Sequence, residues 1–95
     1  MIDVLIEAGD GRIYSLAEAQ AVRLAESMRS KPRHRESCIP AADKLETALV
    51  DGEWAAPVRF TEAEALAAAR ALEANIVGDP DNTRLRRLQW ALMDD

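Results

Sequence analysis

Residue types that support catalysis or covalent cross-linking are scarce in this chain. There is one cysteine, Cys38, and one histidine, His34. A single cysteine excludes an intramolecular disulfide and agrees with a reducing compartment, so a cytoplasmic protein is expected. His34 and Cys38 lie close in sequence, but a zinc site needs about four such ligands and a cysteine nucleophile needs an activating base. The sequence therefore predicts no metal, no cofactor and no enzymatic activity.

Long apolar segments and ligand-binding loops are lacking as well. No apolar run approaches the ~20 residues that span a bilayer, and residues 1–7 carry acid where a signal peptide needs base. The sequence contains no glycine-rich phosphate loop. Residues 79–84 differ from a calcium loop, because Arg84 stands where that loop requires glycine. We therefore expect no membrane partner and no calcium site.

The composition is that of an ordinary globular domain. The 95 residues include 48% hydrophobic and 31% charged side chains. A chain of this length can bury one modest core without disulfides or metals. Residues 1–95 are therefore expected to form a single domain, and the composition is typical of a soluble protein.

The N-terminal residues 1–14 predict a β-hairpin. β-branched residues alternate with other types over residues 2–7, which is the period of a strand. Residues 8–11 contain two glycines, which tolerate the positive φ of tight turns, and residues 12–14 form the expected returning strand. A third strand is expected over residues 58–60, beside the returning strand. Because so small a sheet is unstable alone, its apolar face must pack on helices.

Two successive helical hairpins are predicted over residues 15–51 and 61–95, with a connector at 52–60. Ser15 and Thr61 each begin a Ser/Thr-x-x-Glu capping box, so each should cap a helix. The helices carry apolar stripes at helical spacing, which should face one core. The stripes consist of Ala17, Ala21, Leu24, Ala25 and Met28; Ala41, Leu45, Ala48 and Leu49; Ala65, Ala69, Leu72 and Ile76; and Leu85, Leu88, Ala91 and Leu92.

Proline, glycine and asparagine mark the other helix ends. Pro40 fits the first turn of the second helix, and Gly52 follows its last residue. Gly78 stands where a left-handed C-terminal cap is expected, and Asn82 can cap the last helix. The predicted fold class is mainly α, a single compact domain of two helical hairpins with an N-terminal β-hairpin and one short extra strand.

The two halves resemble each other, which leaves an internal duplication open. Each half has an aromatic residue before its capping box, Tyr14 or Phe60, and each closes with a similar leucine-rich helix. Duplicated hairpins would form a scaffold that presents a surface. The matching segments are not offset by a constant number of residues, however, and helices rich in Ala, Leu and Glu look alike by composition alone. Two helical hairpins are predicted in either case.

The net charge of −5 is unevenly distributed. Most of the charged residues over 36–82 are acidic, whereas two short segments, called islands here, are basic. The islands consist of Arg29, Lys31, Arg33 and Arg35, and of Arg84, Arg86 and Arg87. The first island has two interpretations. It binds phosphates or an acidic surface of a partner, or it is a solvated loop whose first arginine lies favourably at a helix C-terminus. The second island has the same two interpretations, and its position at a helix N-terminus opposes the helix dipole.

The two tryptophans are expected in different surroundings. Trp90 lies on the other side of the last helix from Leu85. It is either exposed beside Arg86 and Arg87, as in interface cores, or buried because the chain is short of large core residues. We favour burial of Trp90, and we expect Trp54 to plug the junction of the two halves.

The preferred function is a non-catalytic module, adaptor or inhibitor that docks on another protein, since an acidic body repels a long polyanion. The candidate contact residues are Arg29, Lys31, Arg33, Arg35, Arg84, Arg86, Arg87 and Trp90. One alternative is a nucleic-acid or phosphate-binding accessory protein that uses the basic islands 29–35 and 84–87. Another is an acidic inhibitor that occupies the basic groove of a nucleic-acid-handling enzyme.

Overall fold

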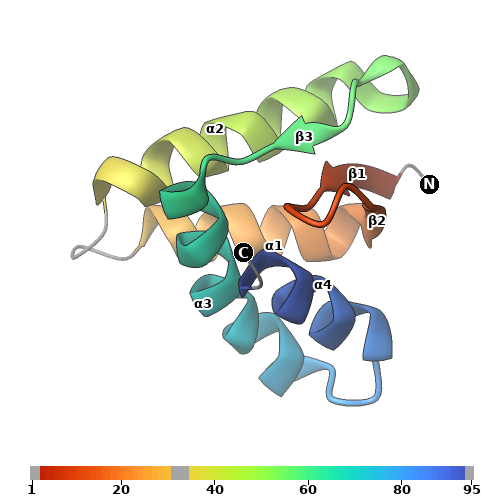
Figure 1. Cartoon of the computed structure of the whole chain (residues 1–95), viewed down its shortest axis with the longest axis vertical. Coiled ribbons are helices and arrows are strands. Elements are labelled where there is room, and N and C mark those ends of the chain that lie inside the picture. The colour runs from red at the N-terminus through yellow and green to blue at the C-terminus, as the bar shows by residue number, and fades with distance from the viewer. Residues whose placement is uncertain (1–2, 31–34, 94–95) are drawn as a thin grey trace.

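A computed structural model describes residues 3–30 and 35–93, in which four α-helices pack with a small sheet (Figure 1). This confirms the mainly helical fold class with an N-terminal hairpin and a short third strand. The elements are β1 (Asp3–Glu7), β2 (Ile13–Ala17), α1 (Glu18–Arg29), α2 (Arg35–Asp51), the 3-10 helix η1 (Gly52–Trp54), β3 (Val58–Arg59), α3 (Glu62–Gly78) and α4 (Thr83–Met93).

The helices pack as the two predicted hairpins, α1 with α2 and α3 with α4, and α1 and α2 also contact α3 (Figure 1). Small residues line these contacts, since Ala21 on α1 and Ala68 on α3 are fully buried. Alanine allows helix axes to approach closely, so much of the core has little side-chain volume. The largest fully buried apolar side chains are Ile6, Leu24, Met28, Leu45, Leu72, Ile76, Leu85 and Leu88.

The sheet has the strand order β2-β1-β3. β1 pairs antiparallel with β2, and it pairs in parallel with β3 through Ile6 and Glu7. The prediction that the third strand lies beside the returning strand is therefore wrong. α4 contacts β2, whereas β3 adds to the other side of β1, where Val58 joins Val4 in the core. Periodicity alone does not distinguish these two edges.

The predicted cap at Ser15 is also wrong. Ser15 lies within β2 opposite Leu5, and α1 begins only at Glu18, without a side-chain hydrogen bond at its start. The neighbouring Leu16 is buried opposite Val4. Strand pairing and burial of Leu16 hold this segment extended, and they outweigh the local preference for a helix start.

The second capping box is confirmed at the start of α3. The amide of Glu64 donates to Oγ1 of Thr61 over 3.2 Å, and the amide of Thr61 donates to Oε1 of Glu64 over 2.8 Å. Two amides that the helix leaves free are thus satisfied reciprocally. Thr61 follows β3, where no strand continues past it, so the local signal determines the helix start.

The two candidate caps should differ when each is replaced by alanine. Thr61→Ala should lower the free energy of unfolding by about 1 kcal/mol, because it leaves an amide of α3 without its acceptor. Ser15→Ala should lower it much less, since Ser15 caps nothing. Equilibrium urea unfolding of both variants measures this difference. Equal midpoints for the two variants would contradict the assigned starts of α1 and α3.

Pro40 and Gly78 differ from their predicted roles. α2 begins at Arg35, so Pro40 lies inside the helix beyond its first turn and cannot donate to the carbonyl of Glu36. Gly78 is the last residue of α3, and within residues 3–30 and 35–93 a positive φ occurs only at Gly11 and Gly52. At the end of α3, the free carbonyl of residue 76 instead accepts a hydrogen bond from the amide of residue 79.

The remaining two helix ends are confirmed. α2 ends at Asp51, and Gly52 has a φ of 63°, so glycine permits the chain to leave the helix in a left-handed conformation. α4 begins after Asn82, whose Oδ1 accepts a hydrogen bond from the amide of Arg84 over 3.2 Å. This bond satisfies one of the free amides of the first turn.

Candidate functional site

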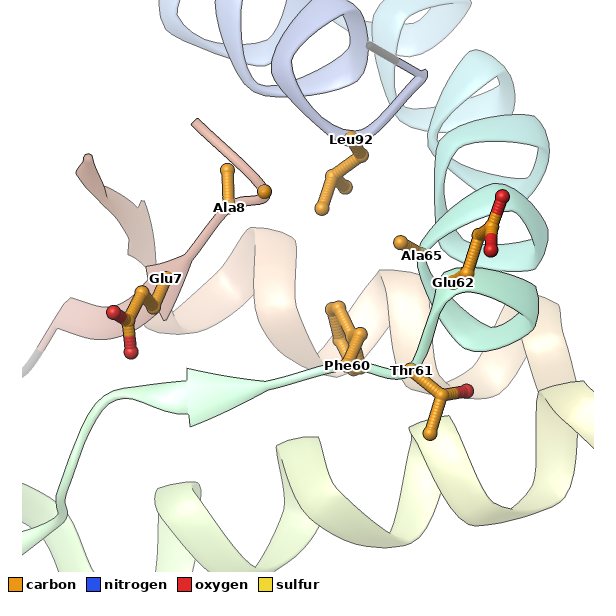
Figure 2. A pocket seen from close by; sticks show the side chains of 8 residues that line it. Glu7, Ala8, Phe60, Thr61, Glu62, Ala65 and Leu92 are labelled. Atoms are coloured by element: carbon orange, nitrogen blue, oxygen red, sulfur yellow. The ribbon is translucent and has the colours of Figure 1, made fainter. Parts of the chain in front are cut away.

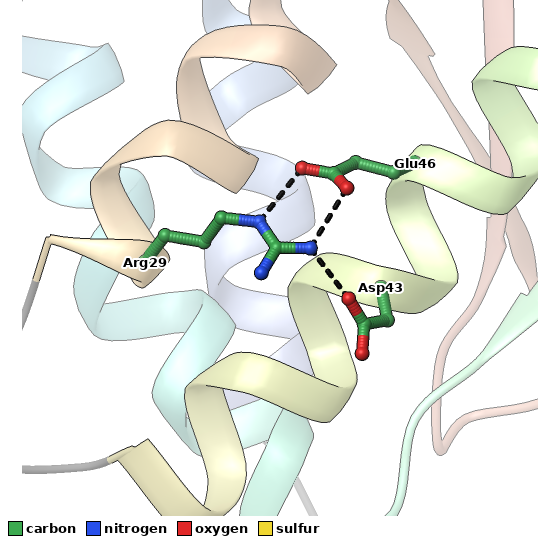
Figure 3. Close-up of polar contacts among 3 residues, drawn as sticks. All are labelled: Arg29, Asp43 and Glu46. Atoms are coloured by element: carbon green, nitrogen blue, oxygen red, sulfur yellow. Dashed lines mark hydrogen bonds and ion pairs between the residues drawn. The ribbon is translucent and has the colours of Figure 1, made fainter.

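Arg29, the first residue of the first basic island, is held by two carboxylates (Figure 3). Its Nε and Nη2 donate to the two carboxylate oxygens of Glu46 over 2.8 and 2.7 Å, and Nη2 also donates to Asp43. These bonds hold the pKa of Arg29 above its ordinary value, and the bond to Arg29 holds the pKa of Glu46 below its ordinary value. The end of α1 is thereby joined to α2.

This pairing changes the interpretation of the first island. Arg29 is engaged inside the helical hairpin, so its charge is balanced before any partner arrives. Lys31 and Arg33 lie outside the described residues. Arg35 is the first residue of α2, and its side chain is likewise not described. Arg29, whose side chain is described, therefore stabilises the contact between α1 and α2.

The second island lies on the exposed face of α4. Arg84, Arg86 and Arg87 are all exposed, and so is Trp90, whose side chain is 63% accessible. The expected burial of Trp90 is therefore wrong. Gln89 occupies the extra buried position of α4 instead, where its Nε2 donates to the carbonyl of Ala69 over 3.0 Å. At 100° per residue, Trp90 projects between Arg86 and Arg87.

A shallow hollow of about 450 Å³ brings α4 together with the β1–β2 turn and the start of β2. It is lined by Asp10, Arg12, Ile13, Tyr14, Arg87, Trp90 and Ala91. Ile13 is 55% exposed. Trp90 and Ile13 thus expose apolar side chains next to Arg12 and Arg87. We refer to Arg12, Ile13, Arg87 and Trp90 as the basic surface.

Asp10 is used within the turn beside the basic surface. Its carboxylate accepts the amide of Arg12 and the hydroxyl of Tyr14, each over 2.9 Å. The bond from the Arg12 amide holds the pKa of Asp10 below its ordinary value, and the bond to Asp10 raises the pKa of Tyr14. Neither Arg12 nor Arg87 forms an ion pair with another described residue. Arg12 lies close to Asp10 and Tyr14 without an ion pair, so both guanidinium groups can still donate to a partner.

A second exposed apolar group lies where α2 ends. Trp54 and Val50 are 87% and 86% exposed, and the acidic residues Asp51 and Glu53 are exposed beside them in sequence. The expectation that Trp54 plugs the junction of the halves is wrong, because the chain turns at Gly52 and it is Ala55 and Val58 that pack on the core. We refer to Val50, Asp51, Glu53 and Trp54 as the acidic surface.

Another hollow, of about 390 Å³, lies among the β1–β2 turn, the start of α3 and the end of α4 (Figure 2). Its inner wall is apolar and includes Ala8, Phe60, Ala65 and Leu92. The Glu7 carboxylate points away from these side chains, and it pairs with Arg59. These wall side chains offer neither a nucleophile nor a base, although Thr61 and Glu62 also line the hollow.

The buried acid Glu64 has a structural role. The ammonium of Lys44 donates to its Oε1 over 2.6 Å and to the carbonyl of Arg59 over 2.9 Å. Burial works to raise the pKa of Glu64, but the bonds from Lys44 and Thr61 outweigh burial and leave the pKa below its ordinary value. The carboxylate stays charged and joins α2 to α3, so it is not poised as a general acid or base.

The described residues contain neither a metal-binding cluster nor a membrane-spanning helix. Cys38 is buried on α2, and His34 lies outside the described residues. Within residues 3–30 and 35–93, no three His, Cys, Asp or Glu side chains come close enough to hold a metal ion. In the same part of the chain, no helix is long and apolar enough to cross a membrane.

No protein-family model matches the chain, and comparisons with curated proteins and with solved structures find no significant match. The exposed surfaces are therefore the features of the chain that bear on its function.

Proposed function

We propose that this protein is a non-catalytic interaction module that docks on another protein through the basic surface. The observation that carries the proposal is that exposed Trp90 and Ile13 line one hollow together with Arg12 and Arg87. Tryptophan and arginine are the residue types that most often dominate binding energy at protein interfaces. An exposed indole in one hollow with guanidinium groups that pair with no acid among the described residues therefore has the composition of an interface centre.

The partner that this surface fits is a protein segment with apolar and acidic side chains. Trp90 and Ile13 offer apolar area, and Arg12 and Arg87 can each donate two hydrogen bonds to a carboxylate in a bidentate geometry. Such complementarity raises the rate of association and rejects basic partners. The scarcity of histidine and cysteine supports a non-catalytic role in the cytoplasm.

A nucleic-acid-binding role has less support. Arg29 is paired with Asp43 and Glu46, which removes one cation from the first island. The net charge of −5 also repels a long polyanion. Fluorescence anisotropy with labelled DNA and RNA at about 50 and 200 mM salt tests this alternative, because phosphate contacts make affinity fall steeply with salt. Sub-micromolar binding that collapses at the higher salt would favour nucleic acid over a protein partner.

The proposed function predicts that capture of a partner depends on Trp90. Immobilised protein should retain a partner from a lysate of the native host, and Trp90→Ala should reduce that retention at least tenfold because the interface loses its apolar centre. Trp54→Ala is the matched control for partners other than this chain, since it removes a still more exposed tryptophan outside the basic surface. Mass spectrometry of the retained proteins gives the readout. Equal retention by both variants would exclude the basic surface as the docking site.

A further inference from the structure

We infer that a second copy of this chain is a partner of the basic surface, and that it docks through its acidic surface. The inference rests on the proposed function, because it uses the same residues on α4 and β2. It adds the identity of one occupant and a role for Trp54, which the proposed function leaves unused.

The two surfaces match in composition and oppose each other in charge. The basic surface exposes one tryptophan and one β-branched residue beside Arg12 and Arg87. The acidic surface likewise exposes Trp54 and Val50, beside Asp51 and Glu53. Contact between them would bury both indoles and place carboxylates against guanidinium groups. The arginines can also stack on the face of Trp54 as cation–π partners.

Charge decides between a symmetric dimer and a head-to-tail contact. In a two-fold dimer built on the basic surface, this surface would face itself, which brings Arg12 and Arg87 of one copy near Arg12 and Arg87 of the other. A two-fold dimer built on the acidic surface would bring Asp51 and Glu53 together in the same way. Like charges across an interface cost several kcal/mol. The heterologous contact, basic surface on acidic surface, pairs opposite charges instead.

The basic surface and the acidic surface of one copy lie too far apart to contact each other. In Figure 1 the end of α2 lies at the upper right, α4 lies in the lower half, and the sheet lies between them. Both surfaces of every copy therefore stay available to different neighbours. A heterologous contact of this kind extends into a ring or an open chain rather than stopping at a dimer.

Sedimentation velocity of the purified protein tests the inference. The weight-average mass should rise from the monomer value of 10.5 kDa with increasing concentration, and it should fall again at high salt because the ion pairs are screened. Trp54→Ala and Trp90→Ala should each weaken association at least tenfold. Both side chains are exposed, so the variants should fold, and circular dichroism checks that they do.

A mixture of the two variants gives the sharpest outcome. Trp54→Ala keeps an intact basic surface, and Trp90→Ala keeps an intact acidic surface. An equimolar mixture should therefore form a dimer and nothing larger, while each variant alone stays a monomer. A symmetric interface would not be restored by mixing. Dimers only in the mixture would support the head-to-tail contact.

Three results would overturn the inference. They are a wild-type monomer up to about 1 mM, an assembly that neither substitution weakens, and an assembly that high salt strengthens. A wild-type monomer that still captures another protein through Trp90 would overturn the inference and leave the proposed function standing. Assembly without capture of any other protein would support the inference and restrict the partner to this chain.

Discussion

Asn75→Asp should lower the free energy of unfolding by about 3–5 kcal/mol at pH 7, because it places a carboxylate where water cannot reach it. Asn75 is fully buried on α3. Its Nδ2 donates to the backbone carbonyl and to Oε1 of Gln20, each over 2.9 Å. Oδ1 has no hydrogen-bond partner among the described residues. The introduced oxygen would therefore face two acceptors, and no cation is bonded to this site. Urea unfolding measures the loss.

The pH dependence of this variant distinguishes a buried charge from a simple packing defect. Burial should raise the folded pKa of the introduced carboxyl above its unfolded value of about 3.9. Between these two pKa values the folded state binds more protons than the unfolded state, so stability relative to wild type should rise as the pH falls. Asn75→Ala is the control, and its deficit should stay constant over the same range. A constant deficit for both variants would contradict the buried-charge explanation.

Leu72→Ala should lower the free energy of unfolding by about 2–5 kcal/mol, since Leu72 is fully buried and the alanine-rich core holds few side chains of its size. Leu66→Ala is the matched control on the same helix. Leu66 is exposed and alanine favours helix, so this change should have little effect. Thermal or urea unfolding of the two variants gives the comparison. Similar losses would show that the buried face of α3 is assigned wrongly.

Local sequence signals predicted the elements that depend on local forces. The stripe that contains Leu85, Leu88 and Leu92 is buried as periodicity predicted, because side chains at helical spacing share one face. The caps at Thr61 and Asn82 are present because each satisfies amides within its own turn. Gly52 ends α2 because glycine alone adopts its backbone conformation without strain.

The candidate site was only half visible in the sequence. Arg87 and Trp90 were candidate contact residues because of their residue types. Arg12 and Ile13 lie near the other end of the chain, in the predicted returning strand, and were not among the candidates. A possible signal was Ile13, an apolar residue on the outward side of the returning strand, opposite Glu7. Arg29 stood out as well, and the fold pairs it with two acids of α2 that the sequence places far away.

Sequence alone therefore determined the helices, half of the six predicted helix ends and the buried faces, whereas the tertiary structure decided which competing signal prevailed and which surfaces meet. At Ser15 the sequence matches a capping box, but the residue pairs in β2 instead, because burial of Leu16 against β1 contributes more free energy than one capping hydrogen bond. Trp54 and Trp90 are exposed although both are large, because the chain turns at Gly52 just before Trp54, and Trp90 projects from the face of α4 away from its buried stripe. The basic surface exists only because α4 packs beside β2, and that contact depends on the whole core rather than on any local pattern.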